Sequence, residues 1–486
     1  MTIKDLKPTA VWNYFYEICQ IPHPSKKEEK IIAYLLDFAK KHGLETKKDE
    51  AGNVLITKPA SKGMENRPTV ILQGHVDMVC EKNNDTVHDF DKDPIETYID
   101  GDWLKAKGTT LGADNGIGVA AALAVLAADD MVHPKLECLF TVDEETGLTG
   151  AYALNNDFLT GEILLNLDTE EVGEIYIGCA GGKVATITFT YKPEAAPKDY
   201  FWFKAQVNGL SGGHSGSEIH KGLGNANKIL DRFLWTLNKE YSLVLAEFNG
   251  GNLHNAIPRE AYAIAGVPYN KKESVAVAAN ILAAEVEAEL KAVDPGVKLT
   301  VESTQAPATI IDNETKNNLL NALYVSPHGV YGMSHDIPGL VETSSNLASV
   351  KMKENNTIEV KTSIRSSTES LKADLGNVIE SAYTLAKAKM EFSGGYPGWK
   401  PNPSSKILKV AQESYKKLSG GKDAKIMAIH AGLECGLFLE KYPHLDMISF
   451  GPTITEAHSP GERVNIPSVA EWWDLLVDVL KNIPAK

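Results

Sequence analysis

The 486-residue chain has little of what marks several large classes of protein. Its five cysteines are scattered, odd in number and without a Cys-x-x-Cys pair. That usage disfavours a disulfide framework or a zinc knuckle, so we expect reduced thiols and a cytoplasmic protein. No apolar run approaches the ~18 residues of a membrane span. The N-terminus also lacks the basic segment and apolar core of a secretory signal, so we expect no export by that route.

Basic residues are scarce as well. The chain has 49 Lys and Arg against 64 Asp and Glu, which gives a net charge of −15. Nucleic acids and anionic membranes would not attract such a chain, so we expect neither as a partner. With 43% apolar and 23% charged residues, the composition is that of an ordinary globular protein.

Two common nucleophile patterns are missing. There is no Gly-x-Ser-x-Gly elbow, which removes the commonest signal of a serine hydrolase, and no cysteine has a base in a recognisable pattern. The glycine-rich stretch Leu111–Gly118 lacks both the Gly-Lys-Ser/Thr ending and the Gly-x-Gly-x-x-Gly spacing of phosphate-binding loops. Phosphate binding is therefore only weakly indicated.

Strand-like and helix-like segments alternate over residues 1–185, as is typical of layered α/β domains. From about Thr186 the pattern changes to two successive sets of strands and helices. Prolines within residues 396–403 mark a linker, after which a helix–strand–helix pattern returns. We therefore predict an α/β domain, residues 1–185 and 400–486, with a mixed sheet flanked by helices. It is interrupted by an inserted α+β domain, residues 186–399, made of two similar subdomains.

The most informative stretch is Asp143-Glu144-Glu145, which follows the strand-like run Leu139–Val142. An apolar run of this kind belongs in a sheet, so its end would bring three carboxylates to the sheet edge. Carboxylates crowded together raise one another's pKa unless a cation lies among them. We therefore expect a metal site in which one of the paired glutamates is a ligand and the other a base. The competing interpretation is an acidic surface turn.

His75 and Asp77 follow directly after another apolar run, Thr69–Leu72. A neutral imidazole binds zinc-like ions, and a carboxylate two positions on can accept its other N–H and so orient the ring. The pair alone is a weak signal. Its place at the carboxyl end of a strand strengthens the signal, because sites in α/β proteins gather there.

Three more candidate ligands lie at comparable places. Asp168 ends an apolar run, His458 follows one at a short distance, and Asp114 precedes an alanine-rich helix. Capping of that helix is the competing interpretation for Asp114. Each residue is ambiguous alone, but five strand ends or their loops carry a ligand, which chance rarely supplies.

Together these motifs resemble the M20 family of co-catalytic zinc metallopeptidases, and most closely its aminoacyl-histidine dipeptidase branch. The resemblance covers nearly the whole chain, and it implies an α/β zinc domain interrupted by a lid domain. The matching motifs are His75-Val76-Asp77, Gly112-Ala113-Asp114-Asn115-Gly116, Asp143-Glu144-Glu145-Thr146-Gly147, Asn166-Leu167-Asp168 and Glu456-Ala457-His458-Ser459-Pro460-Gly461-Glu462.

The resemblance implies two Zn²⁺ ions, with Mn²⁺ or Co²⁺ as alternatives that suit the same donors. Asp77 would orient a ligand histidine, and Glu144 would be the general base acting on a metal-bridging water. Asp114 would bind both ions. The full ligand set would be His75, Asp114, Glu145, Asp168 and His458.

The resemblance also implies substrate-binding residues, three of them in the inserted domain. His214 would donate to the oxyanion of the tetrahedral intermediate, and Asn255 would contact substrate. Arg365 is the natural fork for a peptide's terminal carboxylate. Glu434 would hold a substrate amino group. The competing interpretations are a histidine in a flexible glycine turn for His214 and a surface ion pair for Arg365.

From these motifs we expect a metallodipeptidase that cleaves unblocked dipeptides, Xaa-His dipeptides included. One alternative is an M20-type deacylase, tripeptidase or carboxypeptidase acting on other small peptides or N-acyl amino acids. A remoter one is a non-catalytic two-domain protein that binds amino acids or peptides. A homodimer formed through the lid and a monomer with a duplicated lid both stay open.

Overall fold

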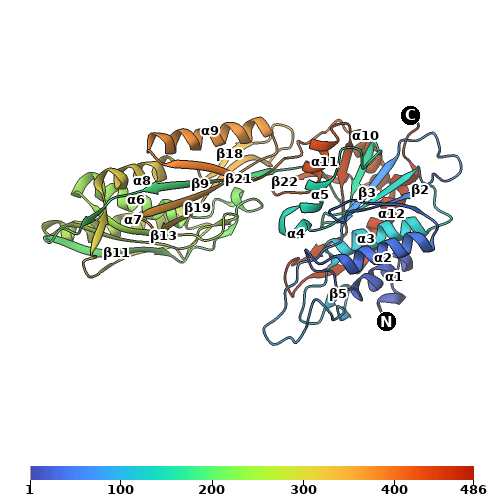
Figure 1. The fold of residues 1–486 in the computed structure, drawn as a ribbon, viewed down its shortest axis with the longest axis horizontal. Helices are drawn as coiled ribbons and strands as arrows, with labels where there is room; N and C mark the ends of the chain where they lie inside the picture. Colours follow the sequence, from blue (N-terminus) through green and yellow to red (C-terminus); the bar gives the residue numbers. More distant parts are fainter. Residues whose placement is uncertain (1) are drawn as a thin grey trace. The chain divides into compact units, whose positions relative to one another are not determined.

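The structure, a computed structural model, describes residues 2–486 and consists of two compact units. The first unit contains the residues up to Gly178 together with Trp399–Ala428 and Leu433–Lys486. The second contains Cys179–Gly398 and the short segment Ile429–Gly432. Early and late parts of the chain therefore lie side by side in the first unit, where blue and red segments meet in Figure 1.

A mixed sheet with the strand order β1-β2-β6-β3-β7-β23-β8-β22 forms the middle of the first unit. Neighbours among β6, β3, β7 and β23 are parallel, so the carboxyl ends of these four strands share one edge. Every residue of β3, β6 and β7 is buried, as expected of parallel strands covered on both faces. The strands are β1 (Glu45–Lys48), β2 (Val54–Lys58), β3 (Val70–His75), β6 (Leu136–Thr141), β7 (Ile163–Asn166), β8 (Glu174–Cys179), β22 (Lys425–Ile429) and β23 (Asp446–Ser449).

Helices cover this sheet, which confirms the predicted α/β class. α3 packs against α1 and β3, and α10 packs against α12 and β23. Small residues let α3 approach the sheet closely: a Cβ on Gly118 would lie 2.7 Å from the carbonyl oxygen of Leu167. The helices are η1 (Ile3–Asp5), α1 (Thr9–Cys19), α2 (Glu29–Lys41), α3 (Ala113–Ala127), α4 (Glu144–Gly147), α5 (Thr149–Ala153), α10 (Lys406–Leu418), α11 (Cys435–Lys441) and α12 (Ile466–Lys481).

A smaller antiparallel sheet in the same unit has the order β24-β25-β5-β4. Its strand β25 lies between the loop that carries His458 and the N-terminus of α12. Asn465, at the end of β25, caps α12 by accepting the N–H of Ser468. The strands are β4 (Thr97–Asp100), β5 (Trp103–Ala106), β24 (Ile454–Thr455) and β25 (Arg463–Asn465).

The second unit is built on an antiparallel sheet with the order β16-β11-β15-β13-β19-β20-β9-β21, with β18 paired to β19. A two-stranded piece, β12-β14, and another, β10-β17, complete it. The strands are β9 (Gly181–Thr190), β10 (Pro193–Ala195), β11 (Tyr200–Asn208), β12 (Gly213–His214), β13 (Val244–Gly250), β14 (Ala256–Ile257), β15 (Ala261–Pro268), β16 (Lys298–Ser303), β17 (Thr309–Ile311), β18 (Gly329–Met333), β19 (Val341–Lys353), β20 (Thr357–Ser366) and β21 (Lys389–Tyr396).

The same βαββαβ arrangement, the ferredoxin-like order, occurs twice in this sheet. One copy runs β11-α6-β13-β15-α7-β16 and is inserted between β9 and α8 of the other, β9-α8-β19-β20-α9-β21. The copies meet at β13 and β19, which pair at Gly250 and Val350. The helices are η2 (Ile219–Lys221), α6 (Ala226–Tyr241), η3 (Tyr269–Lys271), α7 (Lys272–Leu290), α8 (Asn313–Val325) and α9 (Glu369–Leu385).

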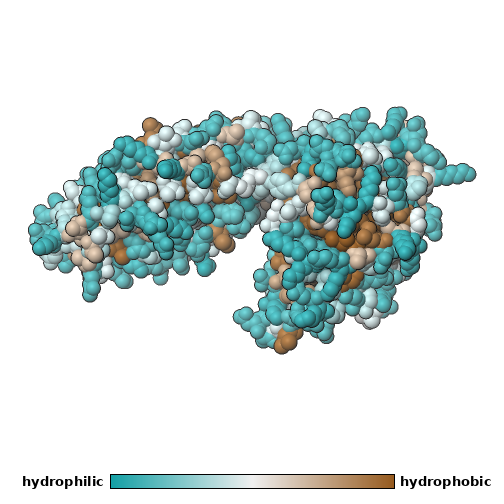
Figure 2. Space-filling view, viewed as in Figure 1, coloured by the Kyte–Doolittle hydropathy of each residue, from teal (hydrophilic) through white to brown (hydrophobic). Residues whose placement is uncertain are grey.

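The apolar runs Thr69–Leu72 and Leu139–Val142 overlap β3 and β6, as the sequence patterns predict. Those patterns missed the edge strand β21. It continues to Tyr396, into the segment interpreted as a linker, because its half-exposed residues and two glycines hide the strand pattern. Among residues 2–486, no helix combines the length and apolar character that crossing a bilayer requires. The face drawn in Figure 2 is mostly hydrophilic, in keeping with the many charged residues.

Candidate metal centre

The parallel strands of the first unit place the predicted ligands near one another. His75 is the last residue of β3, Asp168 lies two residues beyond β7, and Glu145 lies in the short helix α4 after β6. Asp114 lies at the start of α3, and His458 in the loop before β25. The carboxyl ends of parallel strands are where sites of α/β proteins form, because loops converge there.

The five predicted ligands form two groups that share Asp114. In one, His75 Nε2 lies 3.2 Å from Asp114 Oδ1 and 3.3 Å from Asp168 Oδ1. In the other, His458 Nε2 lies 3.2 Å from Asp114 Oδ2 and 3.0 Å from Glu145 Oε2. Each oxygen of the Asp114 carboxylate therefore faces a different imidazole.

This arrangement fits two small divalent cations. Ligand bonds of about 2.0–2.1 Å in tetrahedral geometry put neighbouring donor atoms about 3.3 Å apart, close to the separations observed here. A buried oxygen of Glu145, Oε1, has no hydrogen-bond partner in the part of the chain that the structure describes. Three carboxylates and two imidazoles also give two divalent ions a nearly balanced charge.

Without a cation, several groups of this site have raised pKa values. Burial opposes protonation of His75, but the carboxylates of Asp168 and Asp114 raise its pKa well above the usual value. Hydrogen bonds to Asp114 and Glu145 raise the pKa of His458 to about 11. Burial raises the pKa of Asp168 to about 7. Protons thus occupy positions where a cation would bind, as is expected of a metal site whose ligands must lose protons on binding.

Asp77 holds the turn that carries the two glutamates. Its Oδ1 accepts the N–H of Glu144 at 3.0 Å, and its Oδ2 accepts the N–H of Glu145 at 3.2 Å and the hydroxyl of Ser25 at 2.8 Å. The Nδ1 of His75 lies 3.1 Å from the backbone oxygen of Asp77 and 3.3 Å from its Oδ1. Asp77 therefore contacts the imidazole through both its backbone oxygen and its carboxylate, and the carboxylate also fixes the glutamate turn.

Glu144 lies beside these ligands. Burial raises its pKa well above the usual value, and the charges of Asp168, Glu434 and Glu145 add to the effect while His75 opposes it. A carboxyl group with a raised pKa can both take and return a proton near neutral pH.

Asp143, to which the sequence assigned no role, shapes the same turn. It adopts the left-handed conformation with φ of 50°, and its carboxylate accepts the hydroxyls of Thr146 and Thr149. Its N–H donates to Glu28 at 3.0 Å. The oxygens of Asp143, Glu28 and Asp77 lie close together, but each carboxylate accepts N–H or O–H groups. We therefore interpret this second acidic group as a structural brace.

Glu434 belongs to a buried hydrogen-bond network beneath the ligands. It is fully buried, and its Oε2 accepts Gln73 Nε2 at 2.6 Å and the Thr141 hydroxyl at 2.8 Å. Gln73 Oε1 in turn accepts Asn166 Nδ2 at 2.5 Å, and Asn166 accepts the hydroxyl of Ser449. The network thus links β6, β3, β7 and β23.

Two strand residues of this network each precede a predicted ligand by two positions. Gln73 precedes His75, and Asn166 precedes Asp168, and residues two apart face the same side of a strand. The network therefore forms a polar layer directly below the ligands. The sequence carried a signal for it, because Gln73 and Asn166 are polar residues in otherwise apolar runs.

The other three predicted substrate residues lie in the second unit. Arg365, in β20, donates to the hydroxyl of Tyr396 at 2.8 Å, and among residues 2–486 its buried Nε has no hydrogen-bond partner. A Cβ on Gly216 would lie 3.0 Å from His214 Cε1 and 3.2 Å from Arg365 Nε. Glycine therefore allows His214 and Arg365 to lie close together. Burial, and then the charge of Arg365, lower the pKa of His214.

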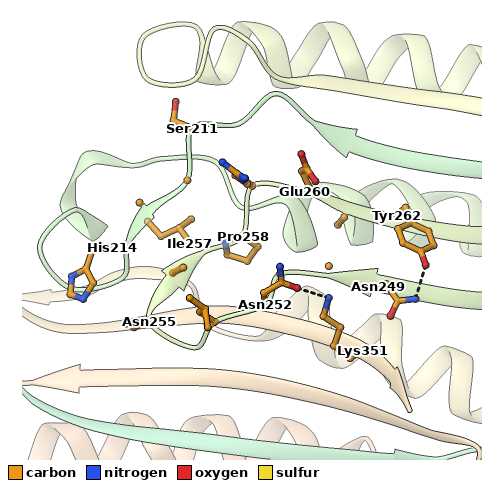
Figure 3. Close-up of a pocket in the computed structure, with 18 of the residues that line it drawn as sticks. Ser211, His214, Asn249, Asn252, Asn255, Ile257, Pro258, Glu260, Tyr262 and Lys351 are labelled. Carbon is orange, nitrogen blue, oxygen red and sulfur yellow. Dashed lines mark hydrogen bonds between the residues drawn. The ribbon is translucent and has the colours of Figure 1, made fainter. Parts of the chain in front are cut away.

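His214 and Asn255 also line a cavity of about 630 Å³ in the second unit. Ser215 N–H donates to the backbone oxygen of Asn255 at 2.8 Å, which joins the two loops. Figure 3 shows His214 and Asn255 toward one end of the cavity and the hydrogen-bonded pair Asn249 and Tyr262 at the other.

Known peptidases are similar to this chain along most or all of its length. The model of peptidase family M20/M25/M40 matches residues 71–482. The cytosol non-specific dipeptidase of Escherichia coli (strain K12) is 47% identical over 484 residues, which span 100% of this chain and 99% of that protein. The crystal structure of aminoacylhistidine dipeptidase from Vibrio alginolyticus superposes with a TM-score of 0.94 at 45% identity, covering 100% of this chain and 99% of that one.

A more distant structure shares the fold. The aminopeptidase PepT from Bacillus cereus has a TM-score of 0.58 at 16% identity and covers 98% of this chain and 99% of its own. With the family model spanning most of the chain, and a relative of high identity spanning all of it, the membership is clear. The chain belongs to peptidase family M20/M25/M40.

Proposed function

We propose that this protein is a metallopeptidase that hydrolyses unblocked dipeptides, Xaa-His dipeptides included. The carrying observation is the 47% identity along the entire chain to a non-specific dipeptidase. The aminoacylhistidine dipeptidase of high structural similarity supports the inclusion of Xaa-His substrates. The converging carboxylates and imidazoles of the first unit supply the chemistry that such a reaction needs.

The proposed metal centre holds two divalent cations, with Zn²⁺ first and Mn²⁺ or Co²⁺ as alternatives. His75 and Asp168 hold one, Glu145 and His458 hold the other, and Asp114 serves both, as the atom separations support. When bound, such ions polarise a scissile carbonyl and lower the pKa of water towards neutrality.

Glu144 is the proposed proton carrier. It accepts the proton of the attacking water and then returns it to the leaving amine, so a single side chain acts as base and then as acid. Its raised pKa supports this double role. Asp77 holds the N–H groups of Glu144 and Glu145, so the base and its neighbouring ligand keep a fixed spacing.

Recognition of both peptide termini explains the restriction to dipeptides. Arg365 carries the planar fork that suits a terminal carboxylate, and His214, beside it, is the proposed donor to the oxyanion of the tetrahedral intermediate. Asn255 is proposed to contact substrate. Glu434 is proposed to hold the substrate amino group. Its Oε2 accepts hydrogen bonds from Gln73 and Thr141, whereas its buried Oε1 has no hydrogen-bond partner among residues 2–486.

The inserted second unit is proposed as the lid, and the first as the catalytic domain. The cytosolic relative and the five scattered cysteines, which form no Cys-x-x-Cys pair, support a cytoplasmic location. The net charge of −15 supports a small peptide rather than nucleic acid or membrane as the partner.

A substrate panel tests this function. The metal-loaded protein is incubated with free dipeptides, with Xaa-His among them, and with N-acetylated forms of the same dipeptides, and release of amino acids is measured. We expect hydrolysis of the free dipeptides. Preference for the acetylated ones would support the deacylase alternative, and binding without any hydrolysis would support a peptide-binding protein.

A further inference from the structure

Glu462 is a buried carboxylate beside the proposed ligands, and it is not one of them. Its side chain is 2% exposed, and among residues 2–486 no basic side chain forms an ion pair with it. Its carboxylate instead accepts four successive backbone N–H groups. Oε2 accepts those of Leu111 at 2.7 Å and Gly112 at 3.0 Å, and Oε1 accepts those of Ala113 at 2.7 Å and Asp114 at 3.2 Å.

These four donors lie at the N-terminus of α3, where backbone N–H groups have no partner within the helix. The N-cap residue, Gly112, has no side chain to accept them, and its φ of 71° favours glycine. A Cβ there would also lie 3.0 Å from the Sδ of Met78. The cap must therefore come from elsewhere in the chain. Glu462 supplies it with a negative charge, which the helix dipole favours.

The same contact joins two loops that carry ligands. Glu462 follows His458 by four residues, and it accepts the N–H of Asp114, whose carboxylate faces His458 Nε2 at 3.2 Å. Glu462 is itself fixed, because its N–H donates to Ser459 at 3.0 Å and β25 begins at the next residue.

We propose that Glu462 is a positioning residue of the metal centre, holding the backbone of residues 111–114 so that Asp114 faces both imidazoles. This inference rests on the proposed function for the presence of metal. A carboxylate offers two oxygens to the four N–H groups, whereas an amide offers one oxygen and two N–H groups. In Glu462→Gln, some backbone N–H groups of residues 111–114 would therefore face the amide NH2 group of the glutamine instead of an acceptor.

Metal affinity provides the test. Zn²⁺ is titrated into the metal-free protein against a chelator of known affinity, and the wild type is compared with Glu462→Gln. We expect the substitution to lower the affinity about 10–100-fold, the range for residues that orient metal ligands. The matched control is Glu456→Gln, in the same loop, where an exposed carboxylate pairs with Arg463; its affinity should match the wild type. Wild-type affinity in Glu462→Gln would overturn the inference.

A double-mutant cycle separates positioning from general stability. If Glu462 acts through Asp114, Glu462→Gln should lower the affinity much less in an Asp114→Asn background. An equal loss in both backgrounds would overturn the inference. Should Glu462→Gln fail to fold, Glu462→Asp decides, because its shorter side chain cannot reach all four N–H groups. Lowered affinity then supports the inference, and wild-type affinity overturns it. A wild-type protein that bound no divalent cation would refute the proposed function as well.

Discussion

Replacing Asp77 with asparagine should weaken metal binding, although no proposed metal ligand is replaced. The Asp77 carboxylate accepts two backbone N–H groups, those of Glu144 and Glu145, and the hydroxyl of Ser25. Burial would raise the pKa of Asp77, but hydrogen bonds from His75 and from Glu144 N–H outweigh it and lower the pKa to about 2. The group is therefore a carboxylate at neutral pH, and the asparagine removes a full charge.

The geometry sets the size of the effect. If the new amide nitrogen takes the place of Oδ2, Ser25 can turn to accept from it, but Glu145 N–H loses its acceptor. If the nitrogen takes the place of Oδ1, Glu144 N–H loses its acceptor instead. Either orientation leaves one buried donor unpaired, which costs about 1–3 kcal/mol. That cost corresponds to a roughly 5- to 150-fold change in an equilibrium constant.

Two measurements show whether the unpaired donor lowers the metal affinity or the stability of the metal-free protein. Chelator competition gives the metal affinity of Asp77→Asn, and urea unfolding of the metal-free protein gives its stability. We expect a loss of metal affinity within the stated range, with a fall in kcat, because the turn that carries Glu145 must be fixed to bind metal. Asp91→Asn, which alters an exposed ion pair with Lys27, is the control. Wild-type affinity and kcat in Asp77→Asn would refute the reasoning.

Three further predictions concern the pKa of a proposed ligand, the buried polar network and the proposed carboxylate site. In the metal-free protein His458 is protonated at neutral pH, since its pKa is raised to about 11. Metal binding should therefore release protons, and the metal affinity should rise with pH. Calorimetry in buffers of different ionisation enthalpy measures this release, and detecting none would contradict the prediction. Gln73→Leu removes partners of Glu434 and Asn166 and should lower the free energy of unfolding by about 2–6 kcal/mol in urea denaturation; an unchanged value would show that the buried network is dispensable. Arg365→Lys keeps the charge but loses the planar guanidinium group. The KM should therefore rise for free dipeptides and change little for their C-terminal amides. An equal rise in KM for both would show that Arg365 does not bind the substrate carboxylate.

Local patterns were sufficient to locate the buried parallel strands β3 and β7 and the residues that follow them. Runs such as Val70–Leu72 and Ile163–Leu165 are apolar throughout because these parallel strands are buried on both faces. Each run leads to a candidate ligand at the carboxyl end of its strand or just beyond it: His75 ends β3, and Asp168 lies two residues past β7. The sequence alone therefore suffices to recognise His75 and Asp168 as candidate ligands.

Contacts between distant segments could not be predicted in this way. Glu434 meets Gln73 across 361 positions of sequence, and Glu462 meets Leu111 across 351. Such partners depend on which strands become neighbours, and no local pattern encodes that. The sequence accordingly could not show that Gln73 is a partner of Glu434 or that Asp143 donates its N–H to Glu28.

The most direct test of the account is the metal content and turnover of Glu144→Ala. We predict that this variant keeps the metal content of the wild type, because Glu144 is not a ligand, while dipeptide hydrolysis falls by at least about 10²–10⁴-fold, the usual contribution of a general acid–base. Glu145→Ala, one residue away, should instead lose metal and activity together. A Glu144→Ala variant that hydrolysed dipeptides at the wild-type rate would contradict the account.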